Sequence, residues 1–310
     1  MRVKVLGSAA GGGFPQWNCA CAQCAGVRSG TLKARPRTQT QAAITTDASR
    51  WFLLSASPDL RQQLLSSADF VPPAGSRNTP IHAVVLTSAD VDAVMGLLHV
   101  REFQPLQVFS TTAVRRILTE ENSLFRVLTR SNPPVKWETL PLDRLVPLIP
   151  PSPEDKKGGL FCKAVPLNGT FPDYVGETLR NSLSQEEAVI GLSLVSQEKK
   201  LFYAPNLPGT GDHWVRSVEE SDLAILDGTF WKDDELNAIR KGSKSARQMG
   251  HLPLWGDHGL LRQQFRPSKT RRVLIHLNNT NPVLNDESPE SGIVRDAGWE
   301  IAYDGMELSI

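Results

Sequence analysis

Three cysteines near the N-terminus form the densest group of metal-binding side chains in the sequence. Cys19, Cys21 and Cys24 fall within six positions of one glycine-rich segment. Thiolates at this spacing can surround a tetrahedral Zn²⁺, and a structural zinc site is closed by a fourth Cys or His. We therefore predict a structural zinc ion bound by these three residues.

The fourth ligand of that site stays open in the sequence. Cys162 lies in the apolar segment GLFCKAV, which favours an inert buried thiol. His276 and His251 are better candidates, because the fold could bring either imidazole close. Two alternatives remain: three free thiols in a reducing compartment, or a redox pair formed by Cys21 and Cys24, which lacks the usual strand-to-helix context.

A second set of candidate ligands follows an apolar strand. Residues 81–87 (IHAVVLT) predict a buried strand, and Asp90 and Asp92 come between it and a helix expected to begin near Val94. Two neighbouring carboxylates can bind a hard cation, share a proton, or cap the helix through its free N–H groups. Metal binding and helix capping are both open for this pair.

Two further strands end on residues of the same kind. Residues 223–227 (LAILD) end at Asp227, and His276 lies in the strand 271–277 (RRVLIHL). We expect Asp92, Asp227 and His276 to reach corresponding strand ends. Three strands that each end at a potential metal ligand favour a common site more strongly than any one of these residues does.

The composition excludes several classes of function. The chain of 310 residues has 34 Lys+Arg and 33 Asp+Glu, a formal charge of +1, so it lacks the basic surplus typical of nucleic-acid binding. No segment approaches the ~20 apolar residues that cross a bilayer, and no clear signal peptide is present. Four cysteines are too few for a disulfide framework. We expect a cytoplasmic protein with no membrane and no nucleic-acid partner.

The coarse pattern of elements predicts an α/β fold. A strand over 3–6 leads into the glycine-rich loop, and residues 41–55 predict two strands around a turn at 47–49. Helices recur among many short strands in both halves, which favours two sheets covered by helices on their outer sides. We expect the segment 150–159 to be a surface loop and residues 299–308 to form a hairpin at an Asp-Gly turn.

Several segments resemble the metallo-β-lactamase superfamily. VVLTSADVDAVMGLL (84–98) is similar to its signature T-H-x-H-x-D-H-x-x-G, LAILDGTFW to its bridging-aspartate strand, and VLIHLNNTNP to its late histidine strand. QMGHLP is similar to its Gly-His segment. The resemblance implies an αββα sandwich of two mixed sheets, with residues 1–310 forming one domain that carries a cysteine-rich zinc loop at about 11–26.

A closer resemblance is to the family of pyrroloquinoline-quinone (PQQ) biosynthesis protein B. It rests on GSAAGGGFPQWNCACAQC, ASPDLRQQ, GLLHVREFQPLQVFST, MGHLP, IHLNNTNP and AYDGMEL, and it covers nearly the whole chain. The resemblance implies a role in making this redox cofactor. The family is described in two ways: as transporting the quinone or its precursor, and as hydroxylating the tyrosine-derived precursor with O₂ and non-haem iron.

The sequence departs from both patterns at the metal site. Ser88 and Asp90 stand where the hydrolases have their H-x-H pair, which weakens a two-metal hydrolase interpretation. Ala93 stands where the biosynthesis family generally has a histidine, and alanine cannot bind a metal. We therefore expect weaker iron binding here than in relatives that keep the histidine.

The remaining residues form a candidate iron site. Its metal ligands are Asp92, Asp227 and His276, with Asp90 beside them, a variant of the facial triad with fewer nitrogens than usual. His251 could add a second nitrogen or act as an acid or base. His99, one helical turn beyond the loop, is a weaker candidate, for which a surface or buried structural role is the alternative.

Substrate contacts are assigned to four further residues. Trp17 and Phe14 could pack against a tyrosine-like ring, and Arg61 and Arg101 could pair with carboxylates. The alternatives are aromatic side chains that shield the zinc loop and arginines that are solvated or ion-paired.

Three functions follow from this interpretation. The leading hypothesis is an oxygenase with structural Zn²⁺ and active-site Fe²⁺ that acts on the tyrosine-derived PQQ precursor. The alternatives are a carrier that binds PQQ or its precursor without turnover, and a phosphodiesterase-type metallohydrolase. Other PQQ-pathway enzymes are candidate partners, and a homodimer is a candidate assembly.

Overall fold

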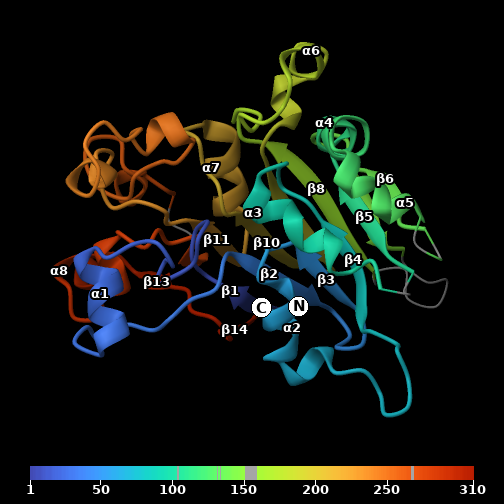
Figure 1. The fold of residues 1–310 in the computed structure, drawn as a ribbon, viewed down its shortest axis with the longest axis horizontal. Helices are drawn as coiled ribbons and strands as arrows, with labels where there is room; N and C mark the ends of the chain where they lie inside the picture. Colours follow the sequence, from blue (N-terminus) through green and yellow to red (C-terminus); the bar gives the residue numbers. More distant parts are fainter. Residues whose placement is uncertain (103–104, 131, 133, 151–158, 267–268) are drawn as a thin grey trace.

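Two seven-stranded sheets face each other at the centre of the molecule (Figure 1). The computed structural model describes residues 1–310 except 103–104, 131, 133, 151–158 and 267–268. The first sheet has the order β14-β1-β2-β3-β4-β5-β6. Its strands are β1 (Arg2–Gly7), β2 (Gln41–Thr45), β3 (Trp51–Leu54), β4 (Ile81–Val85), β5 (Gln107–Ser110), β6 (Lys136–Thr139) and β14 (Glu307–Ser309).

The second sheet has the order β13-β12-β11-β10-β9-β8-β7. Its strands are β7 (Leu145–Ile149), β8 (Leu160–Pro166), β9 (Ile190–Ser196), β10 (Lys199–Ala204), β11 (Leu223–Asp227), β12 (Arg271–Ile275) and β13 (Trp299–Ile301). Both sheets are mixed: β3, β4 and β5 are parallel, as are β10, β11 and β12, whereas β8, β9 and β10 are antiparallel.

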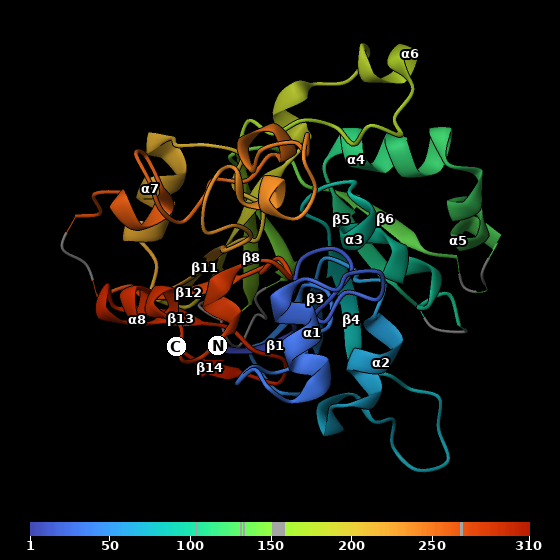
Figure 2. The same ribbon diagram turned by 60° about the vertical axis from the view of Figure 1, so that its left-hand side comes forward.

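Helices surround the two sheets, and α6 projects away from them at the top of both views (Figures 1 and 2). They are α1 (Ala22–Ser29), α2 (Leu60–Leu65), α3 (Val91–Val94), α4 (Thr112–Arg116), α5 (Val127–Arg130), α6 (Glu177–Arg180), α7 (Asp212–Glu219) and α8 (Pro289–Asp296). None of the helices in the described part of the chain has the length and apolar composition to cross a bilayer.

The alternation of side chains along the strands produces two buried layers on the faces of each sheet. Ile44 and Phe52 of the first sheet meet Leu192 and Ile225 of the second in the layer between the sheets. Neighbouring strand residues point the other way and pack under the helices. Because strands buried on both faces need apolar residues at nearly every position, the apolar runs of the sequence become central strands. The expected αββα sandwich is confirmed.

Parallel strands place the candidate ligands at one edge of the sandwich. Asp92 follows β4 of the first sheet, whereas Asp227 ends β11 and His276 follows β12 of the second. The carboxyl ends of these strands open toward the same region of the molecule, which is the usual place for functional groups in such sheets.

The C-terminal segment differs from its predicted hairpin. β13 pairs with β12 in the second sheet, whereas β14 pairs with β1 in the first. The Asp304–Gly305 turn therefore carries the chain from one sheet to the other. The two termini lie side by side (Figure 1), and the Met1 amino group donates a hydrogen bond to the Ile310 carbonyl at 3.0 Å. Residues 151–158 of the expected loop 150–159 lie outside the described residues.

Candidate metal centres

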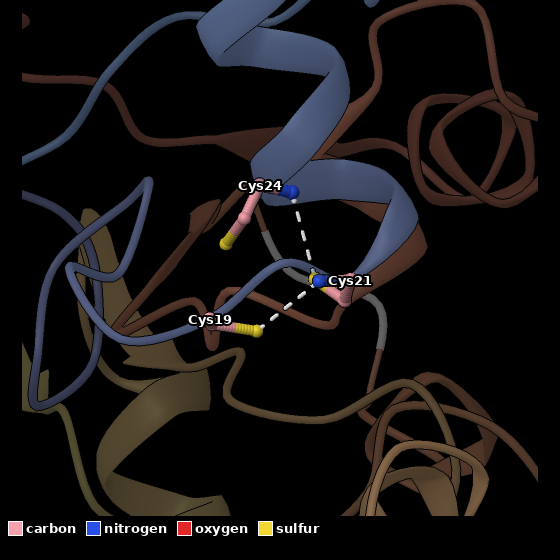
Figure 3. A group of neighbouring side chains, drawn as sticks. All are labelled: Cys19, Cys21 and Cys24. Atoms are coloured by element: carbon pink, nitrogen blue, oxygen red, sulfur yellow. Dashed lines mark hydrogen bonds between the residues drawn. The ribbon is translucent and has the colours of Figure 1, made fainter.

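The three cysteines of the N-terminal loop converge (Figure 3). The sulfurs of Cys19, Cys21 and Cys24 all lie within 4.8 Å of one another. Cys21 is the N-cap of α1, and its sulfur accepts the backbone N–H of Cys24 at 3.5 Å. The Cys19 sulfur accepts the N–H of Cys21 at 3.4 Å. Backbone N–H groups directed at sulfur favour thiolates, so this arrangement fits a tetrahedral zinc site.

Asn279 lies beside all three sulfurs of the cluster. Its side-chain Nδ2 donates toward all three sulfurs, at 3.2 Å to Cys19, 3.7 Å to Cys21 and 3.3 Å to Cys24. The expected histidine is wrong here: His276 and His251 lie together in a different group, with Asp227. The sequence did not single out Asn279 as a partner of the thiols, because an amide is a rare zinc ligand, although it lies only three residues after His276.

The pKa values of the clustered thiols differ from that of the isolated Cys162 because their surroundings differ. Burial raises the pKa of Cys21 to about 11, and burial alone raises that of Cys162 to about 12. Burial also opposes ionisation of Cys19, but hydrogen bonds from the cluster outweigh it and lower its pKa. The hydrogen bonds of the cluster therefore favour the thiolate at Cys19, the form that binds a cation, whereas Cys162 is an inert buried thiol.

Replacement of Asn279 tests its place in the zinc site. We expect Asn279→Ala to weaken zinc binding about tenfold and Asn279→His to strengthen it, because imidazole is a better ligand than an amide. Competition with a coloured zinc indicator measures both. Asn285→Ala, outside the cluster, is the control. Equal zinc affinity in all four proteins would show that Asn279 is not a ligand.

The second centre is built around Asp227, which is fully buried. One carboxylate oxygen accepts the Leu207 N–H at 2.8 Å and lies 2.8 Å from His251 Nδ1. The other accepts the N–H and hydroxyl of Thr229, at 2.9 and 2.6 Å. Burial opposes ionisation of Asp227, but the neighbouring His251 and His276 outweigh it and lower its pKa. Asp227 is therefore a fixed, buried anion.

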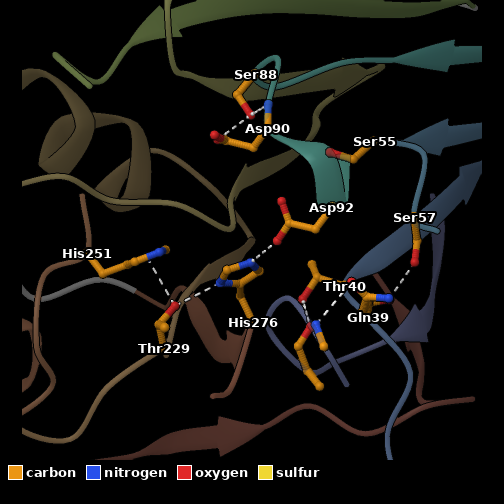
Figure 4. Close-up of polar contacts among 12 residues, drawn as sticks. Gln39, Thr40, Ser55, Ser57, Ser88, Asp90, Asp92, Thr229, His251 and His276 are labelled. Carbon is orange, nitrogen blue, oxygen red and sulfur yellow. Dashed lines mark hydrogen bonds and ion pairs between the residues drawn. The ribbon is translucent and has the colours of Figure 1, made fainter. Parts of the chain in front are cut away.

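The two sheets are joined at this centre by a hydrogen bond between Asp92 and His276 (Figure 4). His276 Nε2 lies 2.9 Å from the Asp92 carboxylate, and its Nδ1 lies 2.8 Å from the Thr229 hydroxyl. The His251 and His276 rings are stacked with centroids 5.2 Å apart. His276 has a φ of 63°, which is uncommon for a residue with a side chain. Such a backbone is found where the surrounding structure needs a side chain in one position.

Asp90 is not used as a helix cap. It occupies the N-cap position of α3, yet its side chain makes no capping hydrogen bond. Instead its carboxylate accepts the Ser88 hydroxyl at 2.8 Å. Burial and the charge of Asp92 raise its pKa to about 6. Asp90 therefore lies beside Asp92 with its carboxylate available to the cavity.

A cavity of about 410 Å³ opens onto these side chains. Asp90, Asp92, His251 and His276 line it, together with Ala93. Asp227 lies behind the two histidines. The nitrogen and oxygen atoms of Asp227, His251 and His276 come within 4.8 Å of one another. This mixture of carboxylate and imidazole donors, with one side open, fits a first-row divalent metal.

The four residues assigned to substrate contacts are not among the described residues that line this cavity. Phe14 is buried in the core, and Trp17 is 84% exposed. Arg61 lies on the exposed side of α2, and Arg101 is paired with Glu102. These placements were wrong because spacing alone does not show which way a loop or short helix turns its side chains. His99 is also exposed and outside the cavity.

The titration of His276 predicts how metal binding depends on pH. Burial disfavours the imidazolium, but Asp92, Asp227 and Asp90 outweigh it and raise the His276 pKa above its ordinary 6.5. In the metal-free protein this pairing stabilises the fold below pH 6.5, and the contribution is lost as the pH rises through the raised pKa.

Because a metal replaces that proton, we expect affinity to rise up to about tenfold per pH unit until His276 is neutral, and then to level off. Anaerobic Fe²⁺ titrations from pH 6 to 9 measure this. His276→Gln should remove most of the dependence, and an unchanged slope in that variant would contradict the assignment.

Comparison with known proteins agrees with this architecture. The model of the β-lactamase superfamily domain matches residues 50–277. Coenzyme PQQ synthesis protein B of Azoarcus sp. (strain BH72) is 41% identical, with 100% of both chains covered. That of Cupriavidus necator is also 41% identical, over 99% of each chain. The chain belongs to the coenzyme PQQ synthesis protein B family.

A solved structure from this PQQ synthesis family has the same fold. The Zn²⁺-bound PqqB from Methylobacterium extorquens is 35% identical, covers 100% of both chains and superposes with a TM-score of 0.89. The family resemblance seen in the sequence is therefore confirmed over the full length. That protein binds zinc, which agrees with the presence of groups of metal-binding side chains in this one.

Proposed function

We propose that the chain acts in PQQ biosynthesis as a metal-dependent oxygenase that hydroxylates the tyrosine-derived precursor. The observation that carries the proposal is the group formed by Asp92, Asp227, His251 and His276 at an open cavity. Two carboxylates and two imidazoles resemble the donor set of non-haem iron sites. Full-length relatives named for PQQ synthesis support the pathway.

In the proposed reaction, each side chain around the cavity would have a separate role. Asp92, Asp227 and His276 would hold Fe²⁺, with His251 as a further nitrogen or as the acid–base group. Bound Fe²⁺ supplies the activation of O₂. Thr229 keeps both histidine rings in place, because its hydroxyl contacts His276 Nδ1 at 2.8 Å and His251 Nδ1 at 3.1 Å. The cavity orients the ring and limits access of water.

The reaction is tested with the full chain loaded anaerobically with Fe²⁺. Addition of the precursor, ¹⁸O₂ and a two-electron reductant should place one labelled oxygen in a ring C–H bond and release the other as water. His251→Gln should lower the rate by at least tenfold, whereas His99→Gln, a change at an exposed histidine, should not. No oxygen uptake and no labelled product would overturn the proposal.

A carrier is the second candidate function, and Ala93 is the observation in its favour. Alanine at this cavity-lining position removes a ligand that the resemblance leads one to expect. A carrier would bind PQQ or its precursor stoichiometrically and release it unchanged. Chromatographic recovery of unaltered precursor from an aerobic, Fe²⁺-loaded mixture with reductant would favour this function. The phosphodiesterase hypothesis is the weakest, since Ser88 and Asp90 replace the H-x-H pair.

A further inference from the structure

A second cavity lies apart from the one at the metal centre. Its volume is also about 410 Å³, and the two cavities have no lining residue in common. Strand β1, helix α2, the segment 36–38 and the turn at 304–305 form its walls. Phe14, which the sequence assigned to a substrate, lines this cavity and not the first. A ligand bound here would occupy a site of its own.

Arg37 brings a buried positive charge to this second cavity. The residue is 6% exposed and lines the cavity. In the described part of the chain, no carboxylate oxygen lies within 4.0 Å of its guanidinium. Asp304 is linked to it through the Ser8 hydroxyl, which accepts from Arg37 Nη1 at 3.0 Å and donates to Asp304 at 2.7 Å. Because buried charges are normally paired, the guanidinium lacks a counter-ion in direct contact.

The guanidinium of Arg37 also has unused hydrogen-bond donors. Nη1 donates to the Ser8 hydroxyl and to the Ala302 carbonyl. Nε is buried without a hydrogen-bond partner, and Nη2 makes no hydrogen bond with the described residues. Nε–H and one N–H of Nη2 lie parallel along one edge of the planar group, a geometry that matches the two oxygens of a carboxylate. This edge is therefore suited to an anion.

The other charged side chains that line the cavity have partners. Lys4 pairs with Asp69 at 2.5 Å and with Glu307 at 3.0 Å. The Asp304 carboxylate accepts the Thr38 N–H at 2.6 Å and the Thr38 hydroxyl at 2.7 Å.

The charge of Arg37 persists at neutral pH. Burial lowers the Arg37 pKa to about 10, and the charge of Asp304 opposes the shift. The guanidinium is therefore still protonated at pH 7, and its one positive charge calls for a single negative charge on the ligand.

We propose that this cavity binds the carboxylate of a small organic acid, held by two hydrogen bonds from the Nε and Nη2 edge of Arg37. Leu6, Phe14 and Pro36 line the same cavity, and they suit an apolar body attached to that carboxylate. The ligand class is therefore a monocarboxylic acid with a compact apolar body. The site involves no residue of the metal centre and does not depend on the proposed oxygenase activity.

Three probes test the class of ligand. Cyclohexanecarboxylate has the charge and the apolar body, cyclohexanecarboxamide has the same shape without the charge, and inorganic phosphate has charge without an apolar body. Binding is measured by equilibrium dialysis on the full, zinc-loaded chain without Fe²⁺. Cyclohexanecarboxylate should bind at least about fivefold more tightly than either of the other probes, because it alone meets both the charged edge and the apolar lining.

Two variants locate the bound carboxylate. Arg37→Lys keeps the charge but lacks the paired donors, so it should weaken cyclohexanecarboxylate at least about fivefold and the carboxamide little. Gln62→Glu adds a negative charge at an exposed lining position and should weaken the carboxylate about threefold. The Gln62 side chain makes no hydrogen bond with the described residues, so this variant serves even if Arg37→Lys fails to fold. Gln264→Glu, at an exposed residue outside the cavity, should leave the affinity unchanged.

A change at the metal centre separates the two cavities. His276→Gln should leave the affinity for cyclohexanecarboxylate unchanged, and loss of binding in that variant would place the probe at the metal centre and overturn the proposal. Tighter binding of phosphate or of the carboxamide would overturn the ligand class. Equal affinity of the unaltered, Arg37→Lys and Gln62→Glu chains would overturn the site. None of these results bears on hydroxylation of the precursor, so the two proposals fail independently.

Discussion

Replacement of Asp227 by alanine is expected to destabilise the metal-free chain by about 3–5 kcal/mol. The carboxylate is fully buried and accepts hydrogen bonds from Leu207 and Thr229. Its removal leaves the Leu207 N–H and the His251 ring without their acceptor and takes away the negative charge that faces two histidines. Metal binding at this centre should be lost in the same variant.

Urea unfolding followed by tryptophan fluorescence measures the change in stability. Asp227→Asn keeps the shape and one acceptor oxygen, so it should fold with a smaller loss of stability and still bind the metal far more weakly. Asp296→Ala, at the exposed end of α8, should change stability by no more than about 0.5 kcal/mol. An Asp227→Ala variant as stable as the starting protein would contradict the role of Asp227 as a buried anion.

Replacement of Ala93 by histidine is expected to tighten Fe²⁺ binding by at least about tenfold. The backbone at this position is fixed, because the Ala93 N–H donates to Asp90 and its carbonyl accepts from Ala56. The side chain lines the cavity beside Asp92, so an imidazole would enter the metal centre. Ala93 is also 9% exposed within the core, and the larger side chain should cost the metal-free fold about 1–3 kcal/mol.

The two effects of this change are measured separately. Anaerobic Fe²⁺ titration gives the affinity, and thermal unfolding with and without Fe²⁺ gives the stability. Ala93→Leu adds comparable bulk without a ligand, so it should show the loss of stability and no gain in affinity. If Ala93→His and Ala93→Leu bind Fe²⁺ alike, position 93 does not face the metal.

The strand ends were the part of the site that the sequence predicted best. An apolar run that stops at a polar residue marks both a buried strand and the position where its side chains leave the core. Asp92, Asp227 and His276 each follow this rule, and the structure brings them to one edge of the sandwich. The motifs of the superfamily reinforced the same three positions.

The partners of those residues could not be predicted in the same way. Thr229 and Asn279 are ordinary polar residues in sequence, and their importance comes from neighbours far away in the chain. Asn279 contacts sulfurs more than 250 positions earlier. Its only local signal is its distance of three residues from His276, which has no meaning until the loop is folded.

The predicted C-terminal hairpin was wrong for a related reason. The Asp-Gly turn at 304–305 is a strong local hairpin signal, but strand pairing is decided by which sheet edges lack a partner. β12 and β1 each provide such an edge, so the two strands separate. The Asp304–Gly305 sequence therefore predicted the turn correctly, but it did not determine which strands β13 and β14 pair with.

The short distance between His276 and Asn279 would couple the two proposed metal sites to each other. Leu277, between them, donates to Ser8 and accepts from Ala10 in the glycine-rich loop, so one tetrapeptide is held by both centres and by the N-terminal segment. A chelator strong enough to extract the thiolate-bound ion would release this tetrapeptide and loosen His276 as well. An apoprotein prepared for iron reconstitution should therefore be refilled with zinc first, and preparations from zinc-starved cells should show poor iron occupancy even when iron is abundant.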